Sequence, residues 1–159
     1  MIPYGRQSID EEDVQGVVAA LRSDWLTTGP RVAEFEEAFA QSTGTQHGVA
    51  VSSGTAALHA SMYALGIGSG DEVIVPALTF AATANCVVFQ GGTPIFCDVE
   101  PDTLLIDPEQ IEKKITSKTK AVVAVDYAGH PCDYDTLRVI TDKHGLNLVA
   151  DACHALGGE

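Results

Sequence analysis

Two short polar segments carry the side chains best suited to chemistry. One is Asp151-Ala152-Cys153-His154-Ala155, and the other is Ser53-Gly54-Thr55-Ala56-Ala57. Each follows a short apolar run, residues 146–150 and 48–51, which is typical of a buried strand. We therefore expect both segments where a strand ends, the second of them opening a helix.

The two segments are suited to bind the two opposite ends of one ligand. The start of a helix presents free backbone N–H groups, and the small residues 53–57 would let an anion approach closely. The Asp151 carboxylate could keep a pyridine nitrogen protonated, so that the ring acts as an electron sink. Pyridoxal phosphate has both a basic ring nitrogen and a phosphate. The plainer alternatives are an ordinary Ser/Thr helix cap, and a capping or ion-paired Asp151.

Other candidates surround this pair. His154 lies three residues after Asp151 and could bond the ring oxygen or the carboxylate, although an ordinary structural histidine is the alternative. Cys153 could pack against a ring face or fill the core. Phe80 lies among small residues that leave room for a flat stacked ring, but it could equally be a core aromatic residue. Trp25, in a Thr-rich loop, favours a surface or interface role.

The N-terminal part predicts two helices. A capping-box pattern at residues 8–11 precedes an apolar stripe with helical spacing. A second amphipathic helix is expected to end near Gly44. The two stripes consist of Val14, Val17, Val18 and Leu21, and of Val32, Phe35 and Phe39.

From there strands and helices alternate, which predicts an α/β fold with a mostly parallel sheet covered on both faces, in three layers. The predicted strands are 49–52, 72–76, 94–98, 121–126 and 146–150, and the predicted helices are 55–65, 80–90, 108–115 and 133–144. In such sheets ligands bind beyond the carboxyl ends of the strands. That rule gathers residues 52–55, 76–80, 98, 126–130 and 151–154 at one edge.

Composition excludes several classes of function. The chain has 159 residues, 45% hydrophobic and 19% charged, with a net charge of −13. Nucleic acid is therefore an unexpected partner. No apolar run reaches the roughly 18 residues of a membrane span, and residues 1–6 lack a signal-peptide pattern, so a cytoplasmic protein is expected. The four cysteines show no metal-ligand spacing, so no metal is expected. We expect Cys86, Cys97 and Cys153 to be buried free thiols.

Five motifs, taken in order, resemble the DegT/StrS-type nucleotide-sugar aminotransferases, a pyridoxal-phosphate family with the type I (aspartate aminotransferase-like) fold. They are Asp-x-Leu-Thr-Thr-Gly-Pro at 24–30, Ser-Gly-Thr-Ala-Ala-Leu at 53–58, Gly-Asp-Glu-Val-Ile-Val-Pro at 70–76, Asp-Tyr-Ala-Gly at 126–129 and Asp-Ala-Cys-His-Ala at 151–155. The resemblance runs from about Pro3 to Glu159. It implies that residues 1–159 are the N-terminal part of the cofactor-binding large domain.

The resemblance also implies residue roles. The cofactor phosphate would be bound by Thr55 and by the backbone of residues Gly54 to Ala56. Phe80 and Cys153 would lie against opposite faces of the pyridine ring, Asp151 would pair with the ring nitrogen, and His154 would support the ring oxygen. The residues that match positions contacting substrate or the neighbouring subunit are Tyr4, Trp25, Leu26 and Thr27.

Segments 78–85 and 125–129 are similar to a subgroup on the route to pseudaminic acid. That subgroup aminates a UDP-linked 4-keto-6-deoxy sugar with L-glutamate as amino donor. In this family the active site forms at a dimer interface, so the resemblance also implies a homodimer.

The family's Schiff-base lysine should follow the Asp-x-x-His motif, and none does so in this chain. The lysines are Lys113, Lys114, Lys118, Lys120 and Lys143. The resemblance thus implies a cofactor-binding part, inactive by itself, from which the small C-terminal domain is absent. Two alternatives remain open. One is a truncated homologue that only binds pyridoxal phosphate or a sugar nucleotide, and the other is an unrelated doubly wound domain for another phosphate ligand.

Overall fold

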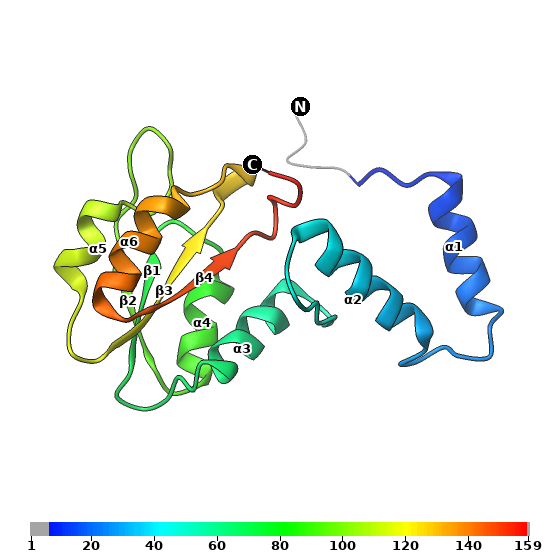
Figure 1. Cartoon of the computed structure of the whole chain (residues 1–159), viewed down its shortest axis with the longest axis horizontal. Helices are drawn as coiled ribbons and strands as arrows, with labels where there is room; N and C mark the ends of the chain where they lie inside the picture. Colours follow the sequence, from blue (N-terminus) through cyan, green and yellow to red (C-terminus); the bar gives the residue numbers. More distant parts are fainter. Residues whose placement is uncertain (1–6, 159) are drawn as a thin grey trace. The chain divides into compact units, whose positions relative to one another are not determined.

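The computed structural model describes residues 7–158, which fall into two compact units divided after residue 50 (Figure 1). The first unit holds helices α1 (Glu11–Leu21) and α2 (Pro30–Thr43). Asp10 caps α1, because its carboxylate accepts the N–H groups of Glu12 and Asp13, and the Asp13 side chain accepts the N–H of Asp10. The capping box therefore begins at Asp10, and its prediction at residues 8–11 was wrong by two positions.

The apolar stripes of both predicted helices lie at the surface of this unit. No residue of α1 is buried, and Ala40 is the one buried residue of α2. Val17 and Phe35, for example, are 61% and 57% exposed. The helical periodicity was therefore predicted correctly, but within residues 7–50 it marks a surface and not a core.

The second unit contains four strands and four α-helices. The strands are β1 (Glu72–Pro76), β2 (Thr93–Cys97), β3 (Thr119–Val125) and β4 (Asn147–Asp151), and the helices are α3 (Gly54–Ala64), α4 (Ala81–Phe89), α5 (Pro108–Lys114) and α6 (Tyr134–His144). The strands are all parallel, in the order β2-β1-β3-β4. Each lies within two residues of a predicted element, so the predicted parallel α/β fold is confirmed.

The predicted strand at 49–52 is wrong. Residues 47–51 have no regular secondary structure, and Val49 is 79% exposed. A strand exists only where its backbone groups have hydrogen-bonding partners, and no described strand pairs with this segment. A short apolar run predicts a strand, but it does not reveal whether a neighbouring strand is present.

The sheet is buried on both faces because successive side chains of a strand point in opposite directions. Val73 and Val75 of β1 join one core cluster with α3 and α4, whereas Ile74 joins the other with α5 and α6. Met62 and Ile111 are fully buried examples from the two covering layers. This alternation produces the predicted three-layer arrangement.

The four cysteines are free thiols, as predicted for Cys86, Cys97 and Cys153. Cys86 and Cys97 are buried, but Cys153 is exposed, and its predicted burial was wrong because it follows β4 in a turn at the sheet's edge. Among residues 7–158, no helix combines the length and apolar character that crossing a membrane requires. Nor do these residues bring three or more His, Cys, Asp or Glu side chains together as a metal site.

Candidate functional site

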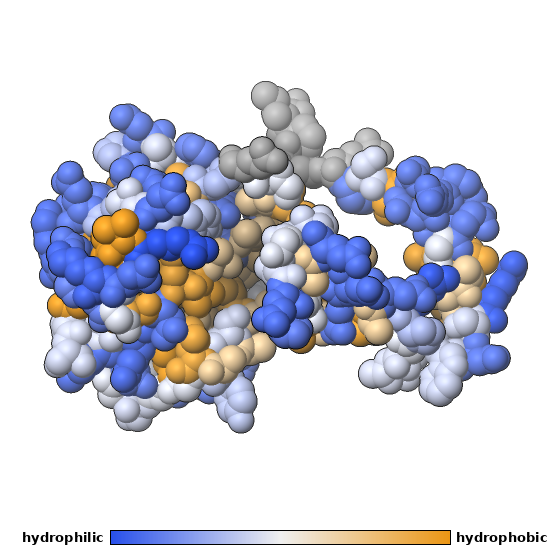
Figure 2. Space-filling view, in the orientation of Figure 1, coloured by the Kyte–Doolittle hydropathy of each residue, from blue (hydrophilic) through white to orange (hydrophobic). Residues whose placement is uncertain are grey.

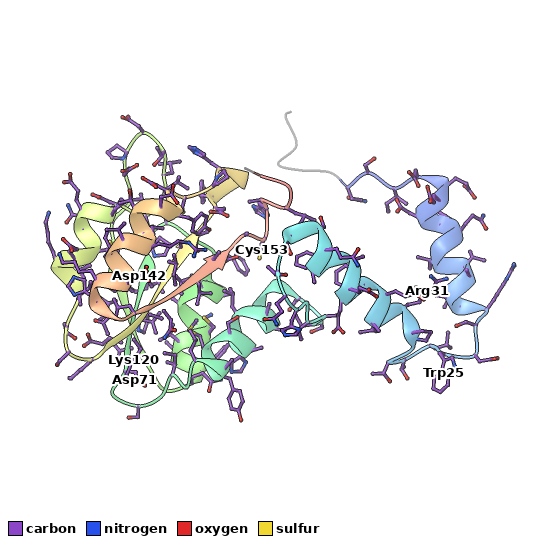
Figure 3. All side chains as sticks on the ribbon, in the orientation of Figure 1. Trp25, Arg31, Asp71, Lys120, Asp142 and Cys153 are labelled. Atoms are coloured by element: carbon purple, nitrogen blue, oxygen red, sulfur yellow. The ribbon has the colours of Figure 1, made fainter. Side chains whose placement is uncertain are left out.

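The carboxyl edge of the sheet gathers the predicted polar residues of the second unit. β3 ends at Val125 and β4 at Asp151, while α4 begins at Ala81 after β1. Because the strands are parallel, the segments that follow them all lie at this edge. In Figure 3, Cys153 lies just past the end of β4, whereas Lys120 lies near the start of β3.

Asp151 is held at this edge by a hydroxyl group. Asp151 is 8% exposed, and the Thr83 hydroxyl on α4 donates to its Oδ2 at 3.0 Å. The Thr79 hydroxyl lies 2.8 Å from that of Thr83. Among the described residues Asp151 caps no helix and forms no salt bridge, so both of its plainer interpretations are excluded.

Sequence reasoning missed Thr79 and Thr83. Both lie in segment 78–85, four residues apart where β1 leads into α4, with Thr79 just before the N-cap Phe80 and Thr83 in the first turn of the helix. The spacing was the available signal, but threonines are so common at helix starts that nothing marked these two as partners of Asp151.

The start of α3 offers backbone groups to an anion. Ser53 is the N-cap, and its hydroxyl accepts the N–H of Ala56 at 3.2 Å. The ordinary cap interpretation therefore holds for Ser53, and the N–H of Ala56 is already used. The N–H groups of Gly54 and Thr55 have no acceptor among residues 7–158, and the Thr55 side chain is exposed. They carry the partial positive charge of the helix start.

The start of α3 touches the segment that follows Asp151. A Cβ added at Gly54 would lie 2.7 Å from Cys153 Sγ, so any larger residue at this position would require the thiol to move. The neighbouring Asp151 carboxylate, together with burial, raises the pKa of the Cys153 thiol to about 11. The anion-favouring helix start and the buried carboxylate therefore flank one thiol.

Phe80 occupies the N-cap position of α4 and is 76% exposed. Its carbonyl oxygen accepts the N–H of Thr83 at 3.1 Å, which is part of the first turn of the helix. Because Phe80 is so exposed, its interpretation as a core aromatic residue is excluded. The ring is free to contact a ligand at the same helix start whose Thr83 holds Asp151.

Asp126, at the end of β3, is a structural carboxylate. Its Oδ1 accepts the N–H of Cys132 at 2.9 Å and the hydroxyl of Tyr134 at 2.8 Å. Burial and this carboxylate raise the pKa values of both partners, that of Cys132 to about 12 and that of Tyr134 above its usual range. Asp126 therefore fixes the loop that follows β3.

That loop packs against the segment after β4. The backbone N–H of Asp126 donates to the Asp151 carbonyl at 3.1 Å. Gly129 has a φ of 85°, and a Cβ there would lie 2.9 Å from the His154 carbonyl oxygen. His154 itself is exposed in a turn closed by the Ala155 N–H on Ala152, and its ring has no hydrogen-bonding partner among the described residues.

The predicted substrate residues belong to the other unit. Trp25 and Leu26 lie in the loop between α1 and α2, 66% and 69% exposed, and Thr27 beside them is also exposed. Tyr4 lies outside the described residues. Contact of these four residues with a substrate stays a prediction.

The lysines lie at the opposite edge of the sheet. Lys113 and Lys114 end α5, and Lys143 lies in the last turn of α6, paired with Glu112 at 2.7 Å. Lys118 and Lys120 flank the start of β3. Because these helices lead back to strand starts, no lysine lies beside Asp151. That position agrees with the expectation that none replaces the Schiff-base lysine.

Comparison with known proteins gives consistent matches. A model of the DegT/DnrJ/EryC1/StrS aminotransferase family matches residues 7–159. DesV of S. venezuelae, solved in complex with a ketimine intermediate, is 41% identical with a TM-score of 0.89, and the match covers 92% of this chain and 39% of DesV. Spr1654 from Streptococcus pneumoniae, described as a sugar aminotransferase and solved in its PLP-form, is 37% identical with a TM-score of 0.92, over 98% and 44% of the two chains.

A third structure, NtdA from Bacillus subtilis with bound cofactor PMP, is 36% identical. Its TM-score is 0.87, and the match covers 94% of this chain and 35% of NtdA. The chain therefore spans less than half the length of each of these three proteins.

Proposed function

Because the chain belongs to the DegT/DnrJ/EryC1/StrS aminotransferase family, we propose that it is the cofactor-binding N-terminal part of a pyridoxal-phosphate-dependent sugar aminotransferase. The observation that carries this proposal is the pairing of a helix start with a buried carboxylate. Gly54 at the start of α3 lies against Cys153, two residues beyond Asp151. The two ends of one small ligand could thus be held together.

The residues at the carboxyl edge fit the cofactor. The N–H groups of Gly54 and Thr55, with the Thr55 hydroxyl, suit the phosphate, and Ala56 keeps the approach open. Asp151 would hold the proton on the ring nitrogen, and the exposed ring of Phe80 would stack on one face of the pyridine. When bound, pyridoxal phosphate supplies an electron sink for the carbon that bears the amino group.

Two exposed residues complete the proposed site. Cys153 would lie against the second face of the ring, and its raised pKa keeps the thiol neutral there. The His154 ring, which is free of other bonds among the described residues, would donate to the ring oxygen. A neutral thiol and a hydrogen-bond donor suit a ring that carries its charge at the nitrogen.

We further propose the transamination of a nucleotide-linked 4-keto-6-deoxy sugar, UDP-linked, with L-glutamate as donor. Segments 78–85 and 125–129 are similar to those of the transaminase that makes UDP-4-amino-4,6-dideoxy-N-acetyl-β-L-altrosamine on the route to pseudaminic acid. This similarity supports the same reaction for the protein. Because the chain spans less than half of its solved relatives, this reaction is proposed for the whole protein. Tyr4, Trp25, Leu26 and Thr27 are the proposed substrate or subunit contacts.

A homodimer is part of the proposal, supported by exposed apolar surface on the sheet unit. Figure 2 shows hydrophobic side chains gathered over β4 and α4. On α4, Val88 and Phe89 are each more than half exposed, as are Tyr63 on α3 and Phe96 on the edge strand β2. Surface of this kind is typical of an interface with more protein.

The test is binding of pyridoxamine 5′-phosphate to the chain, because this form of the cofactor needs no lysine. Its fluorescence is titrated against the wild type and Asp151→Asn, with Asp135→Asn, an exposed carboxylate on α6, as the matched control. We expect saturable binding that Asp151→Asn weakens and Asp135→Asn leaves unchanged. Failure of the wild type to bind, while another phosphate ligand such as UDP does, would favour an unrelated phosphate-binding domain.

A further inference from the structure

We propose that Thr83, supported by Thr79, is a positioning residue that fixes the Asp151 carboxylate for the ring nitrogen of the cofactor. The inference rests on the proposed function and adds to it two residues that do not touch the ligand. It comes from the chain of contacts that runs from Thr79 through Thr83 to Asp151.

The direction of these hydrogen bonds follows from their chemistry. An ionised carboxylate can only accept, so the Thr83 hydroxyl donates to Asp151 Oδ2 at 3.0 Å. A hydroxyl has a single proton, and Thr83 has then used it. The 2.8 Å contact between the two threonines must therefore be donated by Thr79. The two threonine hydroxyls therefore form a relay in which Thr79 donates to Thr83 and Thr83 donates to the Asp151 carboxylate.

This relay of Thr79 and Thr83 contacts only one of the two carboxylate oxygens of Asp151. Thr83 occupies Oδ2, while Oδ1 receives no hydroxyl or backbone N–H group among residues 7–158. A carboxylate fixed at one oxygen cannot rotate freely, so the other oxygen keeps one direction. A ring nitrogen that donates its proton to Oδ1 would find that acceptor already oriented.

Thr83 couples this carboxylate to the residue proposed to stack on the ring. Its side chain is fully buried in the layer formed by α4, and its backbone N–H donates to the Phe80 carbonyl at 3.1 Å. One residue therefore touches both Phe80 and Asp151. Thr83 thus links the carboxylate to the residue that is proposed to stack on the ring.

The other titratable groups near Asp151 are weak competitors. Burial raises the pKa of the Cys86 thiol on α4, and the Asp151 charge raises it further. The Cys153 thiol is shifted upward to about 11, and the Tyr134 hydroxyl is raised while it donates to Asp126. All three thiol and hydroxyl groups therefore stay neutral near pH 8, and of the described side chains it is Thr83 that donates a hydrogen bond to this carboxylate.

The experiment measures ring protonation and not activity. Pyridoxamine 5′-phosphate labelled with ¹⁵N in the ring is bound to the chain, and the ¹⁵N shift is followed against pH. The variants are Thr83→Val, Thr83→Ser and Thr79→Val. Thr141→Val is the control, because Thr141 is also buried but its hydroxyl bonds only the backbone carbonyls of Leu137 and Arg138.

We expect Thr83→Val to lower the pH at which the ring nitrogen loses its proton and to weaken binding about tenfold, as expected for one lost hydrogen bond to a charged group. Thr83→Ser should restore both values, Thr79→Val should shift them less, and Thr141→Val should leave them unchanged. An unchanged titration in a folded Thr83→Val would overturn the proposal. If that variant does not fold, Thr79→Val decides, and an unaltered titration there rejects the relay.

Failure of the proposed function gives a different result. In that case the wild type itself does not bind the probe, and the relay is rejected together with the cofactor. Binding by the wild type that responds to Asp151→Asn but to neither threonine variant rejects the relay alone.

Discussion

Gly54→Ala tests whether the start of α3 meets the loop that follows Asp151. A Cβ at this position would lie 2.7 Å from Cys153 Sγ, with no other atom within 4 Å. Ordinary contact begins at 3.4 Å, so the thiol must move by at least 0.7 Å. Because Cys153 is exposed, it can turn away instead of forcing the backbone apart.

Two opposing effects set the magnitude. Replacing glycine by alanine where the backbone allows it stabilises a protein by about 0.4–1 kcal/mol, through the unfolded chain. Forcing a side chain from its preferred rotamer costs about 0.5–1.5 kcal/mol. In the wild-type background these terms nearly cancel. Cys153→Ala removes the clash. In that background Gly54→Ala should therefore stabilise the protein by the full amount of about 0.4–1 kcal/mol expected from the unfolded chain.

The assay is a double-mutant cycle measured by urea unfolding of the wild type, Gly54→Ala, Cys153→Ala and the double variant. We expect a coupling energy of about 1 kcal/mol, because neighbours couple and distant sites do not. Binding of pyridoxamine 5′-phosphate should weaken in Gly54→Ala and recover in the double variant. Additive free energies of unfolding would refute the contact between the two segments and, with it, the assembled site.

Three further outcomes follow from the same edge of the sheet. Asp151→Ala in the whole protein should lower turnover about 100-fold or more while keeping much of the affinity for phosphate, and turnover kept near wild type would contradict the role of Asp151. The Cys153 thiol, with a pKa raised to about 11 from an ordinary 9, should react with iodoacetamide more slowly at pH 8 than a free cysteine, and Asp151→Asn should speed that reaction. An unchanged rate would remove the contact between them. Burial raises the pKa of Cys132 to about 12 and also raises that of Tyr134, so from about pH 9 upward the unfolded chain releases protons that the folded chain keeps. The free energy of unfolding should therefore fall between pH 9 and 12, and Cys132→Ala should reduce that fall, as urea titrations at pH 8 and 10 would show.

The sequence predicts those parts of the fold that depend on local pattern. The apolar run at 72–76 and the helix that ends at His144 are both found, because periodicity and end signals lie within the segments themselves. The failure at residues 49–52 has the opposite origin, since a strand depends on a partner that its own residues do not encode. The exposed stripe of α1 shows the same limit, because periodicity predicts a face but not what covers it.

The residues of the candidate site can likewise be divided into those that the sequence indicates and those that depend on contacts between distant segments. Asp151 and Gly54 could be found from residue type and from their place at element ends. Thr83 could not, because its role depends on a contact between residues 68 positions apart. The use of the Ala56 N–H by Ser53 likewise depends on a rotamer that residue types leave open.

The proposed phosphate site would rely on backbone dipoles and not on lysines. The chain carries a net charge of −13, and its lysines lie at the opposite edge of the sheet from Asp151. A phosphate at the start of α3 would thus be held by the N–H groups of Gly54 and Thr55 and not by those ammonium groups. Such a site depends on the helix keeping its position, because dipoles lose strength within one turn. In the proposed site the close approach of Gly54 to Cys153 would then matter for binding, since it places that helix start beside the carboxylate that would bind the other end of the ligand.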